Sequence, residues 1–143
     1  MPRIERSALV NHSAQQMFEL VNDVARYPDY LTGCKAARVI SEDESCLVGE
    51  LTLGKAGIEF TFTTRNRLQP PERIDMELES GKFREFEASW QFTSLGDKAC
   101  KVSLTMDFEF DSSLVGFAAE KLFASVANAQ VDALVNRAKV LYG

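Results

Sequence analysis

Hydrophobic and polar residues alternate with a period of two through most of residues 34–110. This period places successive side chains on opposite faces of a β-strand. Between residues 58 and 68, for example, Ile58, Phe60 and Phe62 share one face. Turn-forming segments divide the region into six strands, at residues 42–45, 55–57, 69–72, 80–82 and 95–98. The pattern predicts an antiparallel meander with one apolar face and one polar face.

Helical signals lie on both sides of this meander. After a strand at residues 3–10, Ser13 and Gln16 have the spacing of a capping box, which predicts a helix ending near Asp23. Residues 27–33 then predict a turn or a second short helix closed by Gly33. No Pro or Gly interrupts residues 117–142, where a long helix is expected. Its N-cap is expected among Asp111, Ser112 and Ser113, and its apolar arc contains Val115, Ala119, Leu122, Phe123, Val126, Leu134, Val140 and Leu141.

The order of elements predicts an α+β helix-grip fold, in which a curved antiparallel sheet wraps around the long C-terminal helix. An apolar sheet face needs a cover, and only the last helix is long enough to lie across it. The length of 143 residues fits one domain, residues 1–143, without room for a second core.

Large apolar side chains on the predicted inner face either fill the space below the helix or line a ligand cavity there. A solid core is the simpler interpretation for any one of them. The candidate lining consists of Phe60, Phe62, Met76, Trp90, Met106, Phe108, Leu122 and Val126. Two polar residues fall within the same helical arc, Gln130 and Arg137. Arg137 could bind a carbonyl or phosphate group, although a side chain that extends to solvent near the helix end is the favoured interpretation.

The net charge of −5 argues against broad binding to free DNA, which requires an excess of Lys and Arg. A local RNA contact remains possible at Arg65 and Arg67, because they alternate onto one polar strand face. The alternative is an ordinary solvated surface.

Residues for catalysis or metal binding are sparse. The chain has one histidine, His12, in a polar turn where an exposed or capping role is expected. Cys34, Cys46 and Cys100 lack metal-ligand spacing and are expected to be small buried residues in a reduced protein. We therefore predict no catalytic residues, no metal site and no cofactor. The charged amino terminus and the absence of roughly 20 consecutive apolar residues lead us to expect a cytoplasmic protein.

Several short motifs resemble the coenzyme Q-binding START-like family, a branch of the polyketide cyclase and lipid transport proteins. They begin with residues 18–24, Tyr27-Pro28 and Gly33-Cys34. Later motifs follow in the family's order at residues 73–76, 90–92, 100–102, 108–110, 136–138 and 142–143. The resemblance covers essentially the whole chain and implies a helix-grip fold.

Three functions follow from this resemblance. The leading hypothesis is non-enzymatic binding of ubiquinone or a similar isoprenoid lipid in support of respiration, with a transient contact to a membrane surface. The alternative is a ribosome association toxin that binds the large ribosomal subunit and blocks subunit joining. A polyketide cyclase is the third hypothesis, and it would need an acid or base facing the cavity.

Overall fold

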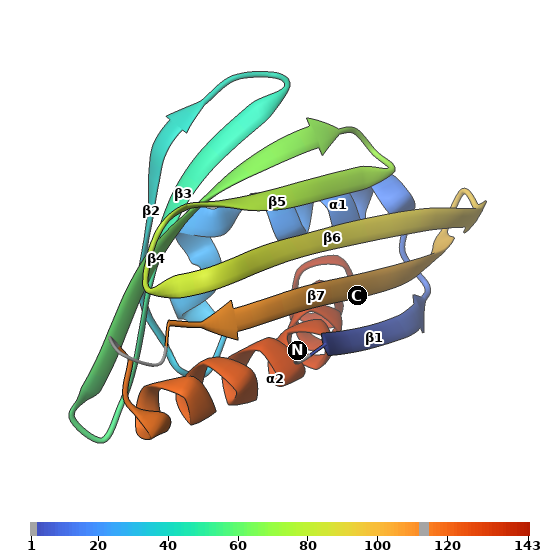
Figure 1. Ribbon diagram of the computed structural model, residues 1–143. Helices are drawn as coiled ribbons and strands as arrows, with labels where there is room; N and C mark the ends of the chain where they lie inside the picture. The colour runs from blue at the N-terminus through green and yellow to red at the C-terminus, as the bar shows by residue number, and fades with distance from the viewer. Residues whose placement is uncertain (1–2, 112–114) are drawn as a thin grey trace.

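The predicted order of strand, helix, short helix, six strands and long helix is present in the computed structural model, which describes residues 3–111 and 115–143 (Figure 1). The elements are β1 (Arg3–Val10), α1 (Ala14–Asn22), the 3-10 helix η1 (Val24–Asp29), β2 (Cys34–Glu42), β3 (Cys46–Lys55), β4 (Ile58–Gln69), β5 (Arg73–Ser80), β6 (Phe83–Gly96), β7 (Ala99–Phe110) and α2 (Phe117–Tyr142).

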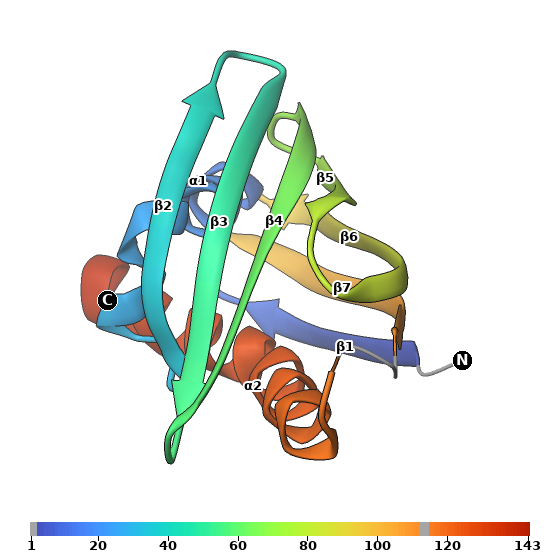
Figure 2. The same cartoon turned by 60° about the vertical axis from the view of Figure 1, so that its left-hand side comes forward.

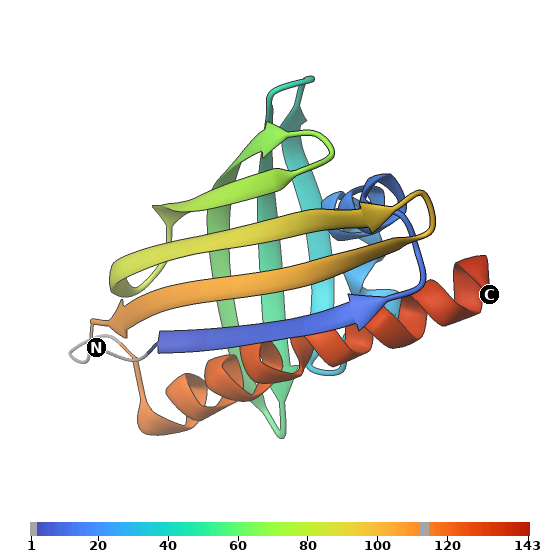
Figure 3. The ribbon, with the colours of Figure 1, turned by 90° about the vertical axis from the view of Figure 1, so that its right-hand side faces the viewer.

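The strands form one antiparallel seven-stranded sheet in the order β1-β7-β6-β5-β4-β3-β2. Strands β2 to β7 follow one another as a meander, and β1 adds to its far edge by pairing with β7. The sheet is strongly curved, and α2 crosses its open side against β1, β3, β4 and β7 (Figures 2 and 3). This is the predicted helix-grip arrangement.

Most of the predicted inner faces are buried. In β7, Val102, Leu104, Met106, Phe108 and Phe110 are all buried, as the period of two requires. One exception is Thr63: a period of two opposite Phe60 and Phe62 places it on the polar face of β4, but it is buried, as is the next residue, Thr64. The pairing of β4 with β5 shifts register between these two residues, so a bulge interrupts the regular alternation there.

The helices confirm one predicted cap and correct another. Ser13 accepts from the Gln16 amide and the Gln16 side chain accepts from the Ser13 amide, so the capping box of α1 is complete. The N-cap of α2 is Gly116 rather than Asp111, and Ser112 and Ser113 lie outside the described residues.

The predicted apolar arc of α2 is also too long at its C-terminal end. Val140 is 74% exposed and Leu141 is 49% exposed. The last turns of α2 extend past the end of β1, where the sheet no longer covers the helix (Figure 3). Helical periodicity identifies a face but not the length over which a partner covers it.

Candidate functional site

An aromatic cluster fills much of the space between α2 and the sheet. Its centre is Phe123 of α2, whose ring centroid lies 5.0 Å from that of Phe108 and 5.1 Å from that of Phe83. Phe123 also contacts Phe60, Phe62, Phe86 and Phe110. Edge-to-face contacts of this kind add to the stabilisation from apolar burial. Phe123, which the predicted cavity lining did not include, is therefore a central contact between α2 and the sheet.

A small cavity of about 40 Å³ remains beside this cluster. Five of the predicted residues line it: Phe62, Met76, Met106, Val126 and Gln130. The other lining residues come mainly from η1, β3 and β4 and are Val24, Tyr27, Leu31, Gly49, Leu51, Leu53, Thr64, Asn66, Phe86, Phe123 and Ala127. Cavities that hold drug-sized ligands are roughly 300–1,000 Å³, so this one is largely closed.

The remaining predicted residues lie away from the cavity. Phe60, Trp90, Phe108 and Leu122 are buried in the core without lining it. Trp90 is only 1% exposed and stacks on Phe92 with the two rings 6° from parallel. The inward orientation of Phe60, Trp90 and Phe108 confirms the strand register, because a register shifted by one residue would expose these side chains.

Buried polar groups occupy one wall of the cavity. The Thr64 hydroxyl donates to the Asn66 amide oxygen at 2.8 Å, and both residues are buried on β4. Gln130 of α2 also lines the cavity. Threonine and asparagine in a strand carry no signal that separates a cavity wall from a solvated face. Sequence patterns therefore identified Gln130 but not Thr64 and Asn66.

The sheet opens next to the cavity, between β5 and β6. These strands pair from Arg73↔Gln91 to Glu77↔Glu87 and then diverge, although β5 still pairs with β4 and β6 with β7. A groove of about 840 Å³ lies over this gap. Met76 and Phe86 line both the groove and the internal cavity. These two half-buried side chains therefore separate the cavity from the outer face of the sheet.

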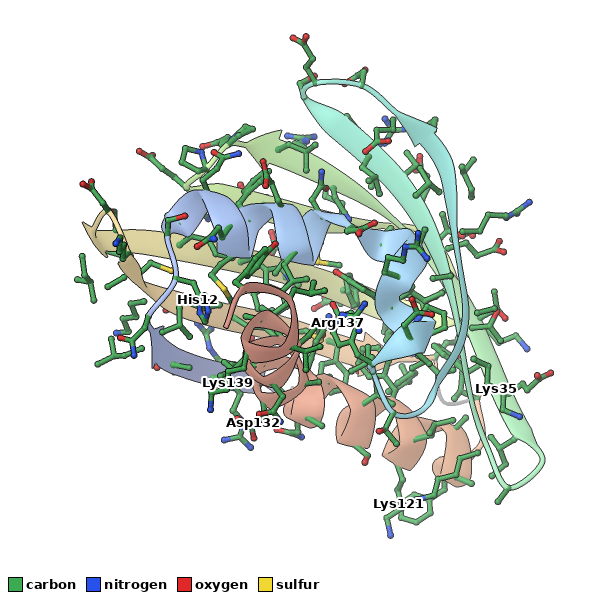
Figure 4. The ribbon with its side chains drawn as sticks, turned by 180° about the vertical axis from the view of Figure 1, so that it is seen from behind. His12, Lys35, Lys121, Asp132, Arg137 and Lys139 are labelled. Atoms are coloured by element: carbon green, nitrogen blue, oxygen red, sulfur yellow. The ribbon has the colours of Figure 1, made fainter. Side chains whose placement is uncertain are left out.

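Arg137 faces η1 and does not line the cavity (Figure 4). Its guanidinium carbon lies 5.4 Å from the ring centroid of Tyr30, within the range of a cation–π contact. The Arg137 Nε atom is buried and has no hydrogen-bond partner within the described residues. Burial raises the pKa of Tyr30, and the positive charge of Arg137 opposes that shift.

Arg65 and Arg67 both lie on the outer face of β4, as predicted, but each is bound to a carboxylate of β5. The Arg65–Glu79 and Arg67–Glu77 ion pairs both measure 2.7 Å. Any contact of these arginines with RNA would compete with their present partners.

The histidine expectation is wrong. His12 is 8% exposed, and its ring lies 5.7 Å from that of Tyr142 in the last turn of α2 (Figure 4). Ser13 rather than His12 caps α1, and the last turn of α2 covers the turn that contains His12. Among the cysteines, Cys34 and Cys100 are buried as expected and Cys46 is half-buried.

Comparisons with known proteins agree with the resemblance seen in the sequence motifs. The family described as polyketide cyclase / dehydrase and lipid transport matches residues 10–135. The ribosome association toxin RatA of Pseudomonas aeruginosa is 47% identical over 140 residues, which cover 98% of this chain and 97% of the relative. The coenzyme Q-binding protein COQ10 homolog B of Xenopus laevis is 26% identical over 99% of this chain, and 60% of its own length is covered.

A solved structure supports the same fold. The ZhuI aromatase/cyclase of Streptomyces sp. R1128 superimposes with a TM-score of 0.81 over 96% of this chain and 93% of that protein, at 20% identity. At this identity the similarity concerns the fold alone. No described helix of this chain is long and apolar enough to cross a membrane.

Proposed function

Because the chain belongs to the polyketide cyclase / dehydrase and lipid transport family, we propose its function from the full-length relatives it most resembles within that family. We infer that it associates with the large ribosomal subunit in the cytoplasm and opposes the joining of the two subunits. The observation that carries this proposal is the 47% identity to a ribosome association toxin across nearly the whole of both chains. This ranks ribosome association above ubiquinone binding, the leading hypothesis from sequence.

The chemistry of the cavity favours binding over catalysis. Its described lining contains no Asp, Glu, His, Lys or Arg side chain. Tyr27 is its one acidic group, and burial raises the pKa of that phenol well above its ordinary value. A general acid or base works best with a pKa near the working pH. This chemistry supports our proposal of a binding protein over the cyclase hypothesis.

Binding of an apolar ligand is a second candidate function. The observation that favours it is the apolar cavity together with the β5–β6 gap, where Met76 and Phe86 face both the cavity and the outer groove. An isoprenoid such as ubiquinone would need these side chains, or α2, to move before it could fit. The two functions are compatible, because one uses the surface and the other the interior.

Sedimentation of purified ribosomal subunits with added protein tests the main proposal. We expect the protein to sediment with the large subunit, to lower the fraction of joined ribosomes, and to do both less as salt increases. Unchanged subunit joining and no cosedimentation at any salt concentration would rule out the proposed function.

The same assay tests the part played by Arg65 and Arg67, which we propose as secondary contacts. We expect Arg65→Gln with Arg67→Gln to weaken binding modestly, since both guanidinium groups already have carboxylate partners. The matched control is Glu77→Gln with Glu79→Gln, which releases both arginines and should strengthen binding if they reach RNA. Equal binding by both double variants would exclude these arginines from the interface.

A further inference from the structure

Arginines and lysines have different roles in the described structure. Seven arginines form ion pairs with carboxylates: Arg3, Arg26, Arg38, Arg65, Arg67, Arg73 and Arg84. Of the other two, Arg6 donates to Asn128 and Arg137 lies over Tyr30. The lysines are all exposed, and none of them has an ion pair with a described residue. The lysines can therefore bind a polyanion without giving up a carboxylate, unlike the seven paired arginines.

Three lysines gather at one end of the molecule, where the β3–β4 turn lies beside the first half of α2 (Figures 2 and 3). Lys55 ends β3 at this turn, Lys35 is near the start of β2, and Lys121 is in the second turn of α2. The stem of Lys35 packs over Gly54, where an added Cβ would lie 2.6 Å from its Cδ atom. Figure 4 shows Lys35 and Lys121 at this same end and Lys139 at the other end of α2.

Contacts at Gly54 and Gly33 bring together the elements that carry these lysines. The Gly54 amide donates to the Gly33 carbonyl at 2.9 Å, which joins the end of β3 to the chain that enters β2. Gly33 in turn lies directly against Val126 and Leu122 of α2. The three elements that carry the lysines are therefore in mutual contact.

An exposed aromatic ring accompanies the lysines. Phe117, the first residue of α2, is 73% exposed, and the Lys121 ammonium lies 5.2 Å from the centroid of its ring. Exposed aromatic rings beside cations stack on unpaired nucleobases while the cations contact phosphates. The positive end of the α2 dipole is at the same place, since the helix begins after Gly116.

We propose that Lys35, Lys55, Lys121 and Phe117 form the surface that binds ribosomal RNA, with the lysines on phosphates and Phe117 on an unpaired base. The inference rests on the proposed ribosome association and names its surface. Two exposed or half-buried carboxylates, Glu59 and Glu120, lie at this end as well and disfavour unspecific attraction of polyanions.

An anionic membrane is a less suitable partner for this surface. Peripheral membrane binding requires a substantial apolar area in addition to charge. Among the described residues, Phe117 is the one large exposed apolar side chain that lies beside these lysines, since the others belong to β1, β2, the end of β6 and the last turn of α2. One ring and three separated lysines are better suited to a flexible single-stranded region of RNA.

The test compares two triple variants of equal charge in cosedimentation with purified large subunits. Lys35→Glu, Lys55→Glu and Lys121→Glu change the proposed surface. Lys98→Glu, Lys101→Glu and Lys139→Glu make the same change at the opposite end (Figures 3 and 4). We expect the first variant to bind on the order of tenfold more weakly or worse and the second to bind nearly as wild type. The salt dependence of log affinity should become shallower by roughly 2 to 3 in the first variant, because each phosphate contact contributes about 0.7–0.9.

Further variants keep the result interpretable. If the fold tolerates the three Glu substitutions poorly, the same lysines are replaced with Gln. This variant removes charge without adding repulsion and should also lose binding to the large subunit. Phe117→Ser should weaken binding without changing the salt slope, because stacking releases no counterions.

Equal loss in both triple variants would overturn the proposal in favour of net charge alone. Normal subunit binding by the first variant, with loss of binding to vesicles of anionic lipid, would overturn it in favour of a membrane surface. If the wild type does not bind subunits at all, the proposed function itself fails.

Discussion

At Gly33 the backbone φ is +93°, a conformation that side chains with a Cβ rarely adopt. An added Cβ would also lie 2.7 Å from the Cγ2 atom of Val126. Two separate constraints therefore require glycine at the point where η1 leads into β2. This explains in physical terms why glycine precedes Cys34 at this position.

Gly57 provides a matched control for a prediction at this scale. It has a φ of +84° in the β3–β4 turn, but nothing lies within 4 Å of an added Cβ. Gly57→Ala should cost about 1 kcal/mol of unfolding free energy from backbone strain alone, and Gly33→Ala clearly more. Combining Gly33→Ala with Val126→Ala should be less destabilising than the sum of the single changes, because the smaller side chain makes room. Urea denaturation measures all four variants, and additive energies would show that the contact with Val126 does not matter.

The segment from η1 to the start of β2 carries buried and half-buried groups whose ionisation opposes folding. The Tyr27 hydroxyl donates to the Val21 carbonyl, which ties η1 to α1. Burial raises the pKa of Tyr27 and Tyr30, and it raises the pKa of the Cys34 thiol from 9.0 to about 11. Tyr27 lies in η1, Tyr30 is its C-cap and Cys34 is the first residue of β2. The fold around these three groups is thus stable while they stay protonated.

Alkaline pH should therefore destabilise the fold. In the unfolded chain Cys34 and the tyrosines lose their protons near their ordinary values of 9.0 and 10.0, whereas the folded chain retains them to higher pH. The stabilisation is complete below about pH 9 and is lost progressively above it. Denaturation by urea across this range should show the loss, and Tyr27→Phe should show a smaller pH dependence. A free energy of unfolding that stays constant or rises above pH 9 would contradict this prediction.

The whole molecule combines a largely closed interior with a sheet in which β5 and β6 separate at one end. Phe123 and the surrounding rings occupy most of the space that a helix-grip fold can offer a ligand, and a cavity of about 40 Å³ remains. The diverging ends of β5 and β6 leave Met76 and Phe86 as the separation between this cavity and the surface. Ligand binding inside the protein would therefore require a change of conformation.

Quinone titration tests this property through Trp90, the single tryptophan. We expect ubiquinone to quench its fluorescence saturably but slowly, and Phe86→Ala to make uptake faster at some cost in stability. Phe117→Ala, an exposed phenylalanine outside the cavity, is the control and should leave uptake unchanged. Val126→Asp should abolish binding by placing a charge on the cavity wall. No quenching by quinones of any tail length would remove the second candidate function.

Local patterns in the sequence were sufficient for the elements and most of their orientations. The alternation in β7 and the capping box of Ser13 and Gln16 depend on residues close together in the chain, so they predicted the strand faces and the start of α1 correctly. The helix-grip class followed from the order of elements, and the family resemblance from the order of short motifs. The exposed positions of Arg65 and Arg67 were predicted for the same reason.

Tertiary structure alone decided which of those side chains meet. Glu77 and Glu79 neutralise Arg67 and Arg65 because β5 pairs with β4 in one particular register. The burial of His12 depends on the last turn of α2, more than a hundred residues away. The cavity is small because Phe123 inserts among rings from three strands, and the volume left between packed side chains is a small difference between large volumes. Such differences are set by three-dimensional packing, which no periodicity along the chain encodes.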